Sequence, residues 1–110
     1  MKQYVVDELR PGDYREIESY LGEKLGASEM PGLYKLPLSS EHLTDTQAAH
    51  AHCQPYYFAI DLEPGRMACE LLVRTDNGLR CDCMGYATEA QLNWLIRFTD
   101  TMLQYLAITI

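Results

Sequence analysis

The middle of the chain carries the alternating pattern of apolar and polar positions that is typical of antiparallel strands. Residues 55–62, 67–75 and 79–86 are rich in apolar side chains and are separated by the turn sequences EPGR and DNG. Runs of this length, bounded by Gly, Pro, Asn and Asp, predict strands joined by tight hairpins. The pattern therefore predicts an antiparallel β-meander over this part of the chain.

A two-residue turn at Pro64-Gly65 would fix the register of the first hairpin. Because a slip by one residue turns every side chain to the other face, the apolar match selects the register. It places four pairs on one face: Leu62 with Met67, Ile60 with Cys69, Phe58 with Leu71, and Tyr56 with Val73. We expect this face to be buried.

The second hairpin depends on the length of its loop. A two-residue loop would turn the charged Asp82 toward the buried face, whereas a three-residue loop over 76–78 avoids this cost. The favoured loop sets Cys81 opposite Val73 and Cys83 opposite Leu71. Together with Cys69, these cysteines are expected to act as small apolar side chains of the core, since apolar surroundings raise the pKa of a thiol and blunt its reactivity.

Two helices flank the meander. Pro11 in a first turn and Gly26 after the last apolar position predict a helix over 11–25. The capping-box spacing of Thr88 and Gln91 opens a second helix over 88–107, and Thr44 with Gln47 has the same spacing before a short helix near 45–52.

The remaining apolar runs complete the predicted architecture. Residues 3–9 predict a short strand, and residues 33–38 predict an edge strand, because Pro37 cannot donate to a ladder. We therefore expect a single α+β domain over residues 1–110: a two-layer sandwich of a meander (55–62, 67–75, 79–86) and an edge strand (33–38), with helices 11–25 and 88–107 on one face.

A second apolar stripe lies on the back of the long predicted helix. Trp94, Phe98 and Tyr105 lie outside its core-facing stripe, and together the two stripes are wider than a surface helix needs. Either the first helix or another protein must cover these rings, since soluble monomers seldom leave such a patch in water. We expect a homodimer with these three residues at or beside the interface.

Composition excludes some classes of function. Sixteen acidic residues against nine basic ones give a net charge of −7, which disfavours nucleic acid and anionic membranes as partners. No apolar run approaches the roughly 20 residues needed to span a bilayer. The N-terminal sequence MKQYVVDELRPGD turns acidic before a signal-peptide core develops. These observations favour the cytoplasm.

His50-Ala51-His52-Cys53 is the strongest candidate for chemistry. His and Cys are zinc ligands, and on a helix His50 and Cys53 share a face at three-residue spacing. No second pair of matching spacing is present in the sequence, which favours a polar segment without metal or cofactor. The alternative is a metal- or thiol-dependent enzyme centred on His50, His52 and Cys53, with zinc as its cofactor.

The favoured function is protein binding. An acidic α+β domain with an aromatic stripe is expected to bind another protein through its long C-terminal helix or its open sheet face. The order of helix, strand, meander and helix is also loosely similar to that of small acidic secretion chaperones, and this likeness implies a dimeric chaperone or adaptor. No sequence motif indicates a substrate or a reaction.

Overall fold

An antiparallel sheet of six strands forms one layer of the protein. The computed structural model describes residues 2–26, 30–76 and 83–109. The strands are β1 (Gln3–Val6), β2 (Leu33–Pro37), β3 (Tyr56–Glu63), β4 (Arg66–Glu70), β5 (Leu72–Thr75) and β6 (Gly85–Tyr86). Strand β3 is the centre of the sheet, with β2 along one edge and β4 and β5 end to end along the other. Strands β1 and β6 pair with the outer edges of β4 and β5.

The helices begin where the sequence provides caps. Helix α1 (Pro11–Leu25) starts at Pro11 and ends before Gly26, which has a φ of 85°. Thr44 and Gln47 form a capping box at α2 (Asp45–Ala49), and Thr88 and Gln91 form one at α3 (Glu89–Tyr105). Short 3-10 helices, η1 (Ser40–His42) and η2 (Ala51–Cys53), flank α2.

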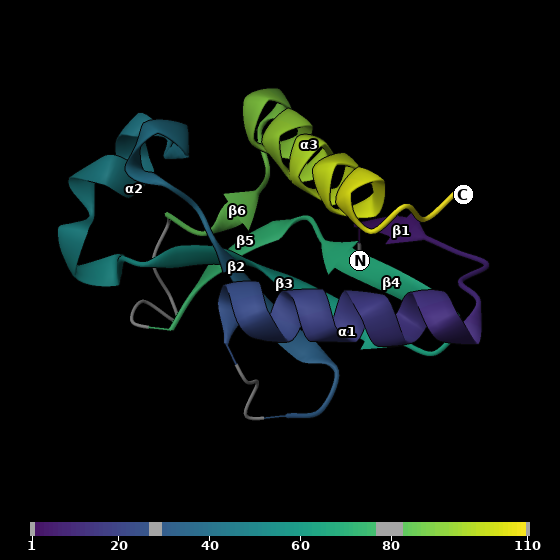
Figure 1. Cartoon of the computed structure of the whole chain (residues 1–110). Helices are drawn as coiled ribbons and strands as arrows, with labels where there is room; N and C mark the ends of the chain where they lie inside the picture. Colours follow the sequence, from purple (N-terminus) through teal and green to yellow (C-terminus); the bar gives the residue numbers. More distant parts are fainter. Residues whose placement is uncertain (1, 27–29, 77–82, 110) are drawn as a thin grey trace.

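Helices α1 and α3 cover the same face of the sheet, so the predicted α+β sandwich is confirmed (Figure 1). The even-numbered residues of β3, from Tyr56 to Leu62, are buried beneath them, while its odd-numbered residues are partly exposed or exposed. Ile17 and Leu21 of α1 and Leu95 and Met102 of α3 complete this core. None of the helices in the described part of the chain is long and apolar enough to cross a membrane.

The first hairpin matches the predicted register near its turn only. Ile60 pairs with Cys69, as predicted, but Tyr56 pairs with Thr75, so its predicted pairing with Val73 is wrong. Leu71, predicted opposite Phe58, lies in a break between β4 and β5. There its N–H donates to Lys2, and its carbonyl oxygen accepts from Ala87. The break shifts the register by two residues, which leaves the same side chains facing the core.

The predicted register of the second hairpin is wrong, because Val73 pairs with Gly85 rather than Cys81. The predicted loop at 76–78 and the first half of the predicted strand 79–86 fall largely outside the described residues, among which β6 covers Gly85 and Tyr86. Cys83 is buried, although away from the predicted partner Leu71, and Cys81 lies outside the described residues. The carbonyl oxygen of Cys83 accepts a hydrogen bond from the side-chain amide of Gln47.

Candidate metal centre

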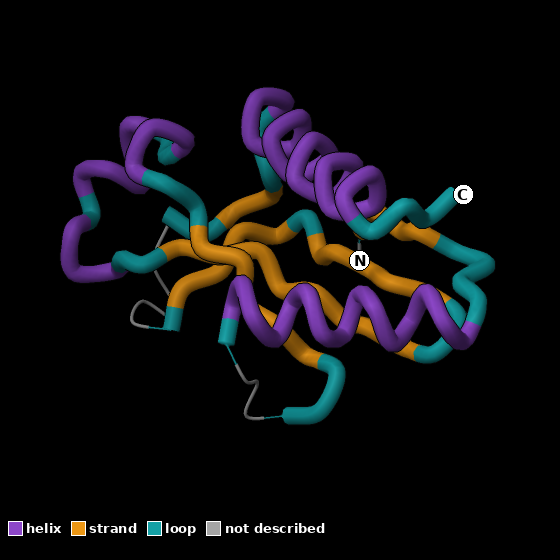
Figure 2. The backbone as a smooth tube through the Cα atoms, viewed as in Figure 1, coloured by secondary structure: helices purple, strands orange, loops and turns teal. Residues whose placement is uncertain are grey.

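The helical turns between β2 and β3 gather at one end of the sheet (Figure 2). Helix α2 ends at Ala49, and the next residue, His50, has a backbone φ and ψ of −98° and 66°, outside the helical range. The carbonyl oxygen of His50 then accepts the N–H of Cys53 at 2.9 Å, closing the 3-10 helix η2. This tight turn brings the side chains of His50 and Cys53 to the same side, as their three-residue spacing predicts.

Cys83 completes a group of three potential metal ligands. One imidazole nitrogen of His50 and the Sγ atoms of Cys53 and Cys83 all lie within 4.8 Å of one another. Zinc binds sulfur at about 2.3 Å and imidazole nitrogen at about 2.0 Å, so ligand atoms on a tetrahedral ion lie roughly 3.3–3.8 Å apart. Side-chain rotations that move the ligand atoms about 1 Å closer together would therefore bring all three within bonding distance of one ion.

The two cysteines differ from the histidine in their exposure. Cys53 is fully buried and Cys83 is 4% exposed, whereas His50 is partly exposed. The sulfur atoms thus lie inside the protein, and the imidazole covers them toward the surface.

Buried polar side chains fix the backbone on both sides of the group. The hydroxyl of Thr75 donates to the carbonyl oxygen of Cys53. The side-chain amide of Gln47 donates to the carbonyl oxygen of Cys83 at 3.5 Å. Gln91, at the start of α3, donates to Oε1 of Gln47 and to the carbonyl oxygen of His42, each at 2.9 Å.

These contacts hold the backbone of the group. Thr75, Gln47 and Gln91 are each no more than 4% exposed. They connect the two cysteine-bearing segments to β5, α2 and α3, so the backbone that carries the two thiols is fixed by buried hydrogen bonds.

The structure does not bring His52 into the group. The described cluster contains His50 and Cys53 but not His52, whose ring instead stacks on the ring of His50 with centroids 5.9 Å apart. Cys83 takes the place that the sequence assigned to His52. Sequence reasoning missed Cys83 because the predicted hairpin register put it opposite Leu71, toward the middle of the sheet.

Cys69 belongs to the core, as its position on the first hairpin predicts. It is fully buried, and burial raises the pKa of its thiol from 9.0 to about 12, while a hydrogen bond with Thr99 opposes part of that shift. A thiol of this kind stays protonated at neutral pH and does not attack substrates or bind metals readily. Cys69 also lies outside the group formed by His50, Cys53 and Cys83.

The residues of the predicted dimer interface differ in their surroundings. Trp94 and Phe98 are partly buried and pack against the core. The ring centroid of Trp94 lies 5.1 Å from that of His42 and 6.3 Å from that of Phe58, so η1 and the sheet contribute to covering it. Tyr105 is 77% exposed. The homodimer stays a prediction, and Tyr105 is the most exposed of its three residues.

Comparisons of the chain with models of known protein families, with curated proteins and with solved structures give no match.

Proposed function

We propose that the protein is a zinc-binding domain in which His50, Cys53 and Cys83 hold the ion. The observation that carries this proposal is the convergence of the three ligand atoms within 4.8 Å, from two segments that are distant in the sequence. Two thiolates and an imidazole suit zinc better than the hard cations Mg²⁺ and Ca²⁺, which take oxygen ligands. The zinc site considered as the alternative in the sequence is thus better supported than a metal-free polar segment, with Cys83 in place of His52.

Three protein ligands leave one position open on a tetrahedral ion. Sites with three protein ligands and a bound water are typical of catalytic zinc, whereas structural zinc is closed by four. The partial exposure of His50 supports access to the open position. The proposed site therefore combines two effects: it joins the turn at 50–53 to the segment before β6, and it presents a coordination position to a small molecule.

Metal analysis of the purified protein tests the proposal. We expect close to one zinc per chain, and we expect its loss in the variants His50→Ala, Cys53→Ser and Cys83→Ser. His52→Ala is the matched control, because His52 is a neighbouring histidine outside the group. Cys69→Ala is the second control, because it removes a buried cysteine from the core instead.

Two further measurements distinguish zinc from other uses of the thiols. Replacement of zinc by Co²⁺ should give the visible absorption bands of a tetrahedral cobalt ion and thiolate-to-metal charge-transfer bands. Both sets of bands should weaken in Cys53→Ser. A chelator should lower the melting temperature, because structural binding energy contributes to folding. A wild-type protein that takes up no zinc on titration, or in which Cys53 and Cys83 form a disulfide under reducing conditions, would contradict the proposal.

A further inference from the structure

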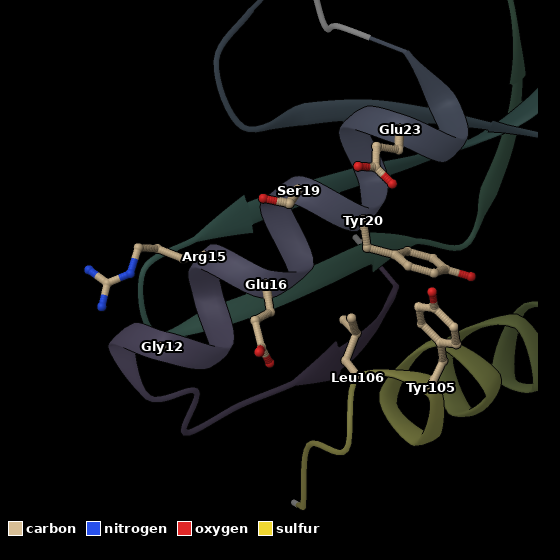
Figure 3. A pocket seen from close by; sticks show the side chains of 8 residues that line it. All are labelled: Gly12, Arg15, Glu16, Ser19, Tyr20, Glu23, Tyr105 and Leu106. Atoms are coloured by element: carbon tan, nitrogen blue, oxygen red, sulfur yellow. The ribbon is translucent and has the colours of Figure 1, made fainter.

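Helices α1 and α3 converge at the C-terminal end of α3, where they enclose a groove of about 490 Å³ (Figure 3). Glu16, Tyr20 and Glu23 of α1 line one wall, and Tyr105 and Leu106 line the other. The groove belongs to a different part of the molecule from the proposed zinc site, since none of its lining residues is a member of the metal group.

Two tyrosine rings form the most conspicuous part of the lining. The rings of Tyr20 and Tyr105 lie with centroids 5.7 Å apart, tilted by 51°. The Tyr105 ring extends from α3 across the gap between the helices toward the ring of Tyr20 (Figure 3). Tyr105 is 77% exposed although it is a large aromatic residue, and such residues are enriched at the centres of protein interfaces.

The same rings suit a cation. Nζ of Lys24 already lies 5.7 Å from the centroid of Tyr20, within the range of a cation–π contact. The ring of Tyr105 is more exposed, so its face remains open to a cation from outside the chain. Lys24 therefore occupies the ring of Tyr20, while the ring of Tyr105 remains available to a second cation.

Charge around the groove favours a basic partner. Glu16 projects into the gap between the helices, and Glu23 lies beyond the tyrosine pair, whereas the guanidinium of Arg15 points away from the groove (Figure 3). The C-terminal end of α3, at Tyr105, adds the negative end of a helix dipole. A second copy of this chain carries the same net charge of −7, so self-association would bring like charges together.

We propose that this groove docks a basic segment of another protein, with a lysine side chain between Tyr105 and Glu16. The aliphatic stem of the lysine packs on Leu106 and the ring of Tyr105, and its ammonium faces the carboxylate of Glu16. This proposal does not depend on zinc. It gives the protein-binding function expected from the sequence a defined surface and a partner of defined charge.

Fluorescence anisotropy with a labelled lysine–glycine peptide tests the proposal, with a glutamate–glycine peptide as the probe control. We expect the basic peptide alone to bind, and Tyr105→Ala and Glu16→Gln each to weaken binding by about tenfold. Tyr105→Phe keeps the ring and should keep the affinity. Glu41→Gln makes the same charge change on η1, away from the groove, and should have little effect.

Three results would overturn the proposal. The first is the absence of binding. The second is equal weakening by Glu16→Gln and Glu41→Gln, which would show attraction to the net charge without a defined site. The third is a concentration-dependent dimer, measured by light scattering, that is lost in Tyr105→Ala. In that case the groove would be occupied by a second copy of the chain. Circular dichroism of Tyr105→Ala shows whether the fold is retained, as expected for an exposed side chain.

Discussion

Replacing Gln47 with leucine breaks the buried chain of amides that runs from Gln91 through Gln47 to Cys83. The Gln91 amide and the Cys83 carbonyl each lose a partner in a buried environment, at about 1–3 kcal/mol apiece. The N–H of Thr44 also loses its bond to Gln47, but it lies in a part-buried position that water reaches more easily. Burial of the apolar leucine side chain in place of the glutamine offsets roughly 1–2 kcal/mol of this loss. We therefore expect Gln47→Leu to lower the free energy of unfolding by about 1–4 kcal/mol.

Urea unfolding followed by Trp94 fluorescence measures this loss, because Trp94 is the single tryptophan. With an m-value of about 2 kcal/mol/M, the midpoint should fall by roughly 0.5–2 M. Gln104→Leu is the matched control: its side chain is exposed, and its stability should stay within about 0.5 kcal/mol of wild type. Zinc affinity of Gln47→Leu should also fall, by roughly 10–100-fold. A Gln47→Leu variant as stable as Gln104→Leu would refute the view that this amide chain holds Cys83.

Three further predictions concern the core and the backbone. Burial raises the pKa of Cys69, so the neutral thiol is favoured in the folded state; its contribution to stability is complete below pH 9 and lost as the pH rises toward 12. The difference in unfolding free energy between wild type and Cys69→Ala should therefore shrink across that interval. In Gly32→Ala the new Cβ would lie 2.8 Å from a backbone oxygen at a φ of 82°, so we expect a loss of about 1–3 kcal/mol in urea unfolding. Gly22 lies within α1, and a Cβ there would meet no atom within 4 Å. Gly22→Ala should therefore raise the free energy of unfolding by up to about 1 kcal/mol.

Local signals predicted the elements of this fold well. Pro11 and Gly26 bound α1, and the Thr88–Gln91 capping box opens α3, because these residues act on the backbone beside them. The Pro64-Gly65 turn likewise sets Glu63 opposite Arg66, as the sequence predicts. Signals of this kind need no knowledge of the rest of the chain.

Register beyond the turns could not be predicted from the same pattern. A shift of two residues, such as the one at Leu71, keeps every side chain on its face, so the apolar match cannot distinguish the two registers. The turn sequence before β6 favoured a short loop, yet the contact of Cys83 with Gln47 depends on α2, which is far away in the sequence.

The candidate site was predicted only in part for the same reason. His50 and Cys53 are close in sequence, and their three-residue spacing was sufficient to place them together. Cys83 reaches them from the segment between β5 and β6, so its position follows from tertiary packing rather than from spacing. The alternation of His50 and His52 was misleading, because only one of the two turns toward the thiols.

The outer edges of the sheet give the protein protection against aggregation. One edge is β2, which ends in Pro37 and so lacks a backbone donor at that position. The other edge is divided between the four residues of β1 and the two of β6, which meet near Leu71 rather than forming one strand. Long, flat, unpaired edges recruit strands from other chains, and these edges are short, interrupted or capped by proline. We therefore expect strand addition by other chains to be disfavoured at these edges.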